Sequence, residues 1–148
     1  SSIKFGYLSY QTAIKAMPDY TLVQQKLADL KAQYQAEAKR AEDEFNRKYE
    51  EFLEGQRDFP KSILQKRQTE LQELMAKNIA FKSNSLEQLA KDEAEALAPL
   101  YDKLNAALAA IGQEKGYAFV LDTDVKALPF INPAMGEDIN EIVKNALK

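Results

Sequence analysis

The feature that most constrains the fold is a helical repeat of apolar residues in the first half of the chain. The repeat advances by three or four residues at each step, through Val23, Leu27, Leu30, Tyr34, Ala38, Ala41, Phe45, Tyr49 and Phe52. An average step of about 3.6 residues places all of them on one face of a single long helix. Repeated steps of four break a strict heptad, so we expect a nearly straight helix. Asp19 is its expected N-cap.

A second apolar stripe follows after a turn over residues 55–60. Gly55 is suited to end the first helix, and Pro60 is suited to open the next. The expected stripe is thin in its first half and dense from Leu97 onward; its members are Leu64, Arg67, Leu71, Leu74 or Met75, Ile79, Lys82, Leu86, Leu89, Glu93, Leu97, Leu100, Leu104, Leu108 and Ile111. Gly112 and Gly116 are the expected helix stops. Residues 19–111 therefore predict a long antiparallel helical hairpin, a coiled-coil arm.

Both ends of the chain predict short strands. Residues 3–8 alternate so that Ile3, Phe5 and Tyr7 face one way, and residues 117–121 form a second apolar run. Residues 127–131 predict a third strand, in which Pro129 is tolerated only at an edge or a bulge. A short helix over residues 10–17 should stop at Pro18. Asp138 should cap a final helix whose apolar face contains Ile139, Ile142, Val143, Ala146 and Leu147.

The predicted fold class is α+β, predominantly α. Its two parts are a β-containing body of residues 1–18 and 112–148 and the projecting arm of residues 19–111, whose base at residues 97–111 packs with the body. Three short strands with open edges make a poor independent core, so we expect the sheet to be completed by oligomerisation. The expected oligomerisation residues are Ile3, Phe5, Tyr7, Leu104, Leu108, Phe119, Val120, Leu121 and Ile131.

The composition argues against an enzyme. The chain has neither Cys nor His, which removes disulfides, thiolate chemistry and the commonest general base and transition-metal ligand. The acidic run at residues 42–44 has basic neighbours three to four residues away, so a salt-bridged helix face accounts for it. Asp122 and Asp124 are better explained by a turn than by a cation site. We predict no catalytic, metal or cofactor site, and no apolar segment is long enough to span a membrane.

Charge and aromatic residues point instead to binding by the arm. Residues 57–82 carry six bases and three acids, whereas residues 37–54 carry four bases and seven acids. The basic tip could attract acidic partners or make weak contact with anionic lipid. Phe81 lies off the expected stripe, which makes it the best candidate for an exposed contact. The candidate contact residues are Tyr49, Phe52, Phe59 and Phe81. An acidic chain with no compact basic sheet disfavours nucleic-acid binding.

Three segments resemble the Skp/OmpH family of periplasmic chaperones. They are the run from Pro99 to Ile111, the sequence Gly-Tyr-Ala-Phe-Val-Leu-Asp that ends at Asp122, and the sequence Asp-Ile-Asn-Glu-Ile-Val-Lys that ends at Lys144. The resemblance implies a homotrimer with a small central β-barrel and three helical arms around a cavity. It also implies binding of unfolded outer-membrane proteins without ATP in the periplasm, where a chain that starts at Ser1 would have lost its signal peptide. The best-known members are strongly basic, whereas this chain has a net charge of −3.

Two other functions fit a long helical arm. A structural coiled-coil adaptor would bind one folded partner through a defined seam. A prefoldin-like chaperone also combines long helices with strands, but its strands connect the two helices, whereas the strands expected in this chain lie at its ends.

Overall fold

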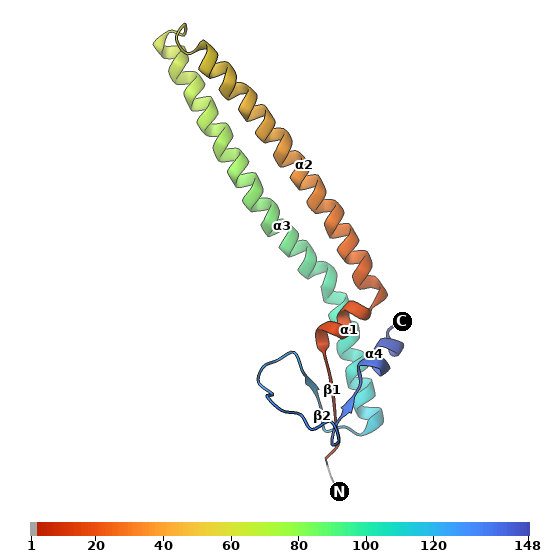
Figure 1. Cartoon of the computed structure of the whole chain (residues 1–148). Coiled ribbons are helices and arrows are strands. Elements are labelled where there is room, and N and C mark those ends of the chain that lie inside the picture. The colour runs from red at the N-terminus through yellow and green to blue at the C-terminus, as the bar shows by residue number, and fades with distance from the viewer. Residues whose placement is uncertain (1–2) are drawn as a thin grey trace. The chain divides into compact units, whose positions relative to one another are not determined.

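The computed structural model describes residues 3–148 and is predominantly helical, with one small sheet (Figure 1). Its elements in chain order are β1 (Phe5–Leu8), α1 (Tyr10–Ala16), α2 (Pro18–Gly55), α3 (Lys61–Lys115), β2 (Phe119–Asp122), β3 (Glu137–Asp138) and α4 (Asn140–Ala146). Both ends of the chain supply the strands, and the residues between them supply the long helices. The predicted fold class is therefore confirmed.

The chain forms two compact units, which we describe separately. The end unit contains the described residues up to Lys26 together with residues 93–148, and the hairpin unit contains residues 27–92. Both long helices contribute residues to each unit.

The end unit contains the hydrophobic core. Its fully buried side chains come from five different elements or junctions: Leu8, Ile14, Leu104, Ile139 and Val143. β1 lies at the centre of the sheet, with β2 and β3 parallel to it on either side. Because the neighbours of β1 both follow the hairpin in sequence, the sheet forms only when the two ends of the chain come together.

The two faces of this sheet differ. Leu8 on β1 is buried, and Val120 on β2 packs against the same core. Side chains alternate along a strand, so Phe5 and Tyr7 lie on the other face. They are in register with Phe119 and Leu121 of β2. The sheet therefore has one core face and one face that carries aromatic and aliphatic side chains away from the core.

The hairpin unit is a pair of antiparallel helices that lie side by side (Figure 1). The ring of Tyr34 on α2 meets the ring of Phe81 on α3 edge to face, with centroids 6.1 Å apart. Close to this contact, Asn78 donates a hydrogen bond of 3.3 Å from Nδ2 to the carbonyl oxygen of Ala41. No residue from 27 to 92 is fully buried, because two helices alone cannot enclose a side chain.

Several predicted boundaries are wrong. Residues 127–131 are not a strand, since Pro129 has no N–H to donate and Phe130 points to solvent with 78% of its surface exposed. The third strand is the two-residue β3. α2 begins at Pro18, where its missing N–H is not needed, so Asp19 lies in the first helical turn and is not the N-cap. Gly112 lies inside α3, which ends before Gly116 at φ 69°.

Asp138 lies one residue before the cap position of α4. The N-cap residue of α4 is Ile139, so the prediction that Asp138 caps the helix is wrong by one residue. Asp138 nevertheless accepts a hydrogen bond at Oδ1 from the backbone N–H of Asn140, at 3.1 Å. Ile139 at the N-cap and Val143 on α4 reach the core as expected, whereas Ala146 is exposed.

Candidate functional site

The carboxylates that could have suggested a cation site hold the start of α1. Asp124 accepts hydrogen bonds from the Ser9 hydroxyl at 2.8 Å and from the Gln11 backbone N–H at 2.9 Å. Asp122 accepts from the backbone N–H groups of Tyr10 and Asp124. The bond from Gln11, followed by the bond from Ser9, lowers the pKa of Asp124. The two aspartates thus satisfy N–H groups that a helix start leaves unpaired.

The acidic run on α2 is part of a chain of ion pairs. Arg40 pairs with Glu37 at 2.7 Å and with Glu44 at 3.3 Å, and Glu44 also pairs with Lys48 at 3.5 Å. The hydrogen bond from Arg40 lowers the pKa of Glu37. All partners lie three or four residues apart on one exposed helix. Within residues 3–148, no three carboxylates come together as a metal site would require.

The outer face of the sheet holds four of the nine residues expected to mediate oligomerisation, Phe5, Tyr7, Phe119 and Leu121. Phe5 and Phe119 stack with ring centroids 5.6 Å apart, and Phe119 remains 48% exposed. Ile3, just before β1, is 70% exposed. Tyr7 and Leu121 are half-buried, and so is Ile131, which lies in the loop between β2 and β3. Phe119 and Ile3 are therefore the members of the expected set that keep much of their surface exposed here.

The expected oligomerisation residues outside that face support it from beneath. Leu104 is fully buried in the core of its own chain. Leu108 and Val120 are partly buried and pack against the same core. These three side chains are therefore used within the chain, and their effect on an interface would be indirect.

The sequence did not single out three large apolar residues that the end unit exposes between β2 and β3. Between β2 and β3 the chain exposes Phe130, Met135 and Val125, with exposed fractions of 78%, 68% and 51%. Their signal in the sequence is an apolar segment that is interrupted by Pro129 and Pro133 and so cannot form a regular strand.

A small polar cluster closes one edge of the sheet. Glu137 on β3 accepts hydrogen bonds from the Tyr117 hydroxyl and from Lys115 Nζ, the latter at 3.0 Å. Both bonds stabilise the charged carboxylate and lower its pKa. Burial and the bond to Glu137 raise the pKa of Tyr117 to about 12. The cluster ties the short edge strand β3 to the end of α3.

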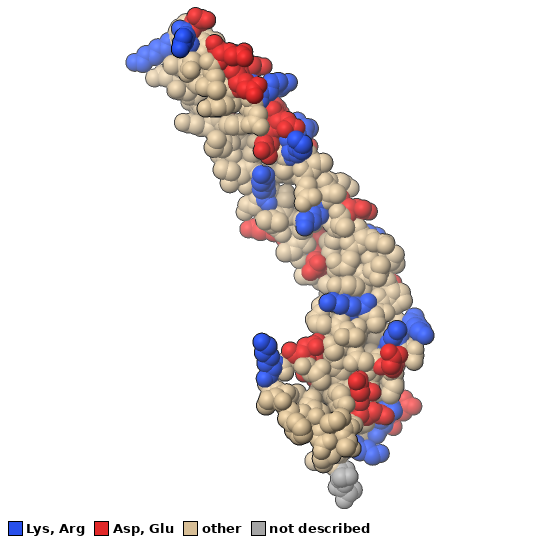
Figure 2. Space-filling view, viewed as in Figure 1, with Lys and Arg blue, Asp and Glu red and all other residues tan. Residues whose placement is uncertain are grey.

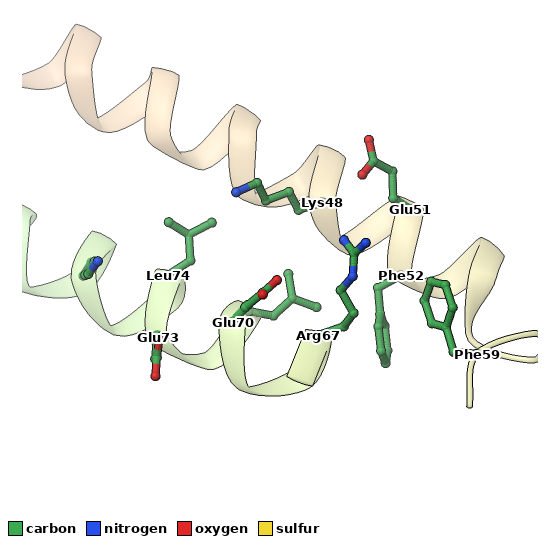
Figure 3. A pocket seen from close by; sticks show the side chains of 10 residues that line it. Lys48, Glu51, Phe52, Phe59, Arg67, Glu70, Glu73 and Leu74 are labelled. Carbon is green, nitrogen blue, oxygen red and sulfur yellow. The ribbon is translucent and has the colours of Figure 1, made fainter. Parts of the chain in front are cut away.

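Two of the four candidate contact residues lie together near the turn of the hairpin. Phe52 and Phe59 stand next to each other in a hollow of about 470 Å³, with Arg67 directed toward them from α3 (Figure 3). The Arg67 guanidinium lies 5.7 Å from the centre of the Phe59 ring, a cation–π distance. The hollow has three bases and three acids in its lining, so its charges balance.

The other two candidates have different surroundings. Tyr49 is 44% exposed and stacks on Phe45, with centroids 6.1 Å apart. Phe81 is half-buried against Tyr34, so the expectation that it lies off the packing stripe is wrong. The stripe of α3 passes through Asn78, Phe81 and Ser85.

The side chains left exposed are those of the neighbouring positions. Met75, Ile79 and Leu86 are 50%, 65% and 67% exposed. Figure 2 shows alternating acidic and basic side chains along the α2 edge of the hairpin unit. None of the helices within residues 3–148 has an apolar stretch sufficient to cross a membrane.

Comparisons with a family model and with a solved structure each match nearly the whole chain. The family described as "Outer membrane protein (OmpH-like)" matches residues 4–147. A solved structure of an OmpH-like protein from Caulobacter crescentus CB15 has a TM-score of 0.81 and 19% sequence identity. The match covers 99% of this chain and 85% of that chain. No curated protein is similar enough to count as a match.

Proposed function

The chain belongs to the OmpH-like family, and from this premise we propose that it is a chaperone that binds unfolded outer-membrane β-barrel proteins and prevents their aggregation. It would act in the periplasm, as a homotrimer, and without ATP or another cofactor. Binding would lower the concentration of free unfolded client and so shift the balance away from aggregation.

The observation that carries this proposal is the composition of the hairpin surface. The hairpin unit has no fully buried side chain, yet it exposes six large hydrophobic residues: Tyr49, Leu53, Ile63, Met75, Ile79 and Leu86. Exposed apolar side chains spread over long helices are suited to many weak contacts with an unfolded chain. Such contacts need no particular client sequence and no chemical step for release.

The proposed trimer is supported by the exposed apolar surface of the end unit. The outer face of the sheet carries the stacked Phe5 and Phe119, and the nearby segment exposes Phe130 and Met135. Burying these side chains against further copies would remove from water a surface that a monomer would leave exposed. β2 and β3 are also edge strands, whose free backbone groups can pair with another chain.

The proposal is tested by diluting a denatured outer-membrane β-barrel protein into buffer with and without the chain. Light scattering should fall as the chain is titrated in, with no added nucleotide. The mass in solution should be about three times 16.7 kDa. Unchanged client aggregation at a large excess of the chain would overturn the chaperone proposal. Loss of all binding through one arm substitution would instead support an adaptor with a defined seam.

A further inference from the structure

Two adjoining hollows form one groove along the hairpin unit. The larger has a volume of about 430 Å³, and the smaller about 240 Å³. Ala38 and Glu42 on α2 and Lys82 on α3 line both of them, so the hollows lie next to each other. Small or short side chains in the seam, Ala38 and Ser85 among them, leave this space open between the helices.

The groove takes its apolar walls from the shifted stripe of α3. Ile79 and Met75 line the smaller hollow, Leu86 lines the larger, and each is at least half exposed. The Tyr34 and Phe81 rings line the larger hollow beside Leu86. The three most exposed apolar side chains of the hairpin unit, Met75, Ile79 and Leu86, therefore stand beside a depression.

The charges around the groove differ from those on the rest of α2. Three lysines and two acids line it, a net charge of +1 in a chain whose total is −3. Lys39 pairs with Asp43 at 3.2 Å, whereas Lys31 and Lys82 have no ion-pair partner among the described residues. Glu42 is the one groove acid outside an ion pair. The chain of pairs from Glu37 to Lys48 has no member in the groove.

The spacing of the hollows suits an extended chain. The α3 residues of the larger hollow centre on position 85 and those of the smaller on position 78 or 79, a separation of about six residues or roughly 9 Å. Alternate side chains of an extended strand point the same way and lie about 7 Å apart. Two large side chains at positions i and i+2 can therefore enter the two hollows if their ends lean about 2 Å further apart than their backbone positions.

We propose that this groove is the site where the chain binds an extended, strand-forming segment with apolar side chains at i and i+2 and acidic residues beside them. The inference rests on the proposed function and names the site and the pattern that it recognises. Ile79 and Leu86 would contact the apolar side chains, and Lys31 and Lys82 would contact the acidic ones. An unfolded β-barrel strand offers the alternating apolar pattern.

The test uses a fluorescent nonapeptide with two Phe residues at i and i+2 flanked by Asp, and measures binding by anisotropy. The double variant Ile79→Gln with Leu86→Gln should weaken binding about tenfold, because two apolar contacts are lost. The matched control, Leu22→Gln with Leu128→Gln, replaces exposed apolar residues of the end unit that line neither hollow. It should stay within about twofold of the wild type. Circular dichroism checks that both variants keep their helices.

Two further peptides test the pattern and the charge. An isomer with its Phe residues at i and i+1, which point to opposite faces, should bind more weakly than the first peptide. A peptide with Lys in place of Asp should also bind more weakly than the first peptide. The Lys82→Gln variant should show a smaller difference in affinity between the Asp peptide and the Lys peptide than the wild type does. Equal loss in the two double variants, or equal binding of the two Phe isomers, would overturn the groove proposal.

Aggregation suppression, measured in parallel, separates this proposal from the function on which it rests. If the wild type suppresses aggregation but the groove variant binds the peptide normally, the groove proposal fails and the chaperone proposal stands. If the wild type binds the peptides in the expected order but suppresses no aggregation, the chaperone proposal fails and the groove remains.

Discussion

At the residue scale, two glycines leave room for aromatic rings in the end unit. A Cβ at Gly136 would overlap the Phe5 ring, and a Cβ at Gly6 would lie 2.7 Å from the Tyr117 ring. Both rings pack directly on the glycine backbone, so a larger residue at either position would push the ring away. Gly136→Ala should therefore lower the free energy of unfolding by about 1–3 kcal/mol, as overpacking usually does. Denaturant titration followed by circular dichroism would measure the change.

Gly112 provides the matched control for that substitution. It lies inside α3, and the nearest atom to its Cβ position is Val120 Cγ2 at 3.9 Å, an ordinary contact. Ala is a better helix former than Gly, so Gly112→Ala should raise the free energy of unfolding by about 0.5–1 kcal/mol. Equal effects of the two substitutions would show that ring packing on Gly136 is not what matters.

The second residue-scale prediction concerns Asp124 and pH. Its pKa is lowered from an ordinary value of 3.8 by the bonds from Gln11 and Ser9. Its contribution to stability is therefore complete above the unfolded-state pKa and is lost as the pH falls through the lower folded-state pKa. Asp124→Asn removes this contribution at every pH. The difference in melting temperature between wild type and variant should be largest at neutral pH and should shrink as the pH falls well below 3.8. A difference in melting temperature that does not change with pH would contradict this role of the Asp124 carboxylate.

At the scale of elements, the sequence predicted those elements that a repeated apolar pattern specifies. Both long helices follow from stripes of many members, where single exceptions do not change the pattern. β3 could not be predicted, because two polar residues, Glu137 and Asp138, show no strand pattern and pair only once β1 lies beside them. The segment around Pro129 looked apolar enough for a strand but lacked a donor.

The shift of the α3 stripe has a different cause. Hydrophobicity alone favours Ile79 and Leu86 for the seam over their polar neighbours Asn78 and Ser85. The structure instead half-buries Asn78 and Ser85, because Leu71 and Leu74 before them, and Leu89 after them, fix the phase of a continuous helix. Choosing the most hydrophobic residue at each step of the stripe cannot detect this constraint on the helix phase. The exposed groove residues were missed for the same reason.

The element-scale prediction is a gradient of local stability. Residues 44–74 lie in the outer part of the hairpin unit, where no side chain is fully buried, whereas β2 pairs with β1 over the core. Backbone amides of residues 44–74 should exchange with deuterium fastest among the helices, and amides of β2 slowest in the chain. Hydrogen exchange followed by mass spectrometry would map the gradient. Equal protection along both long helices would instead support a rigid adaptor.

At the scale of the whole molecule, the proposed trimer depends on the outer face of the sheet. Phe119→Asp places a charge on a side chain that is 48% exposed in the single chain but would be buried in the assembly. The variant should keep its helical content and lose the trimer at micromolar concentration. Sedimentation velocity would report the mass. A trimer as stable as that of the wild type would exclude Phe119 from the interface.

The last prediction separates capture of an unfolded chain from assembly of the trimer. Deleting residues 36–53 and 62–79 removes 18 residues from each long helix, about five full turns, so the remaining faces keep their register. Tyr34 and Phe81, which pack together in the intact hairpin, remain on either side of the deletions, and the turn at residues 54–61 is kept. The end unit is unchanged. We expect the shortened chain to form the same trimer but to lose suppression of client aggregation, because it lacks Met75, Ile79 and most of the exposed hairpin surface. Light scattering with a denatured β-barrel protein, together with the mass in solution, measures both properties. A shortened trimer that protects its client as well as the full chain would place client binding on the end unit, and the hairpin would then need another role.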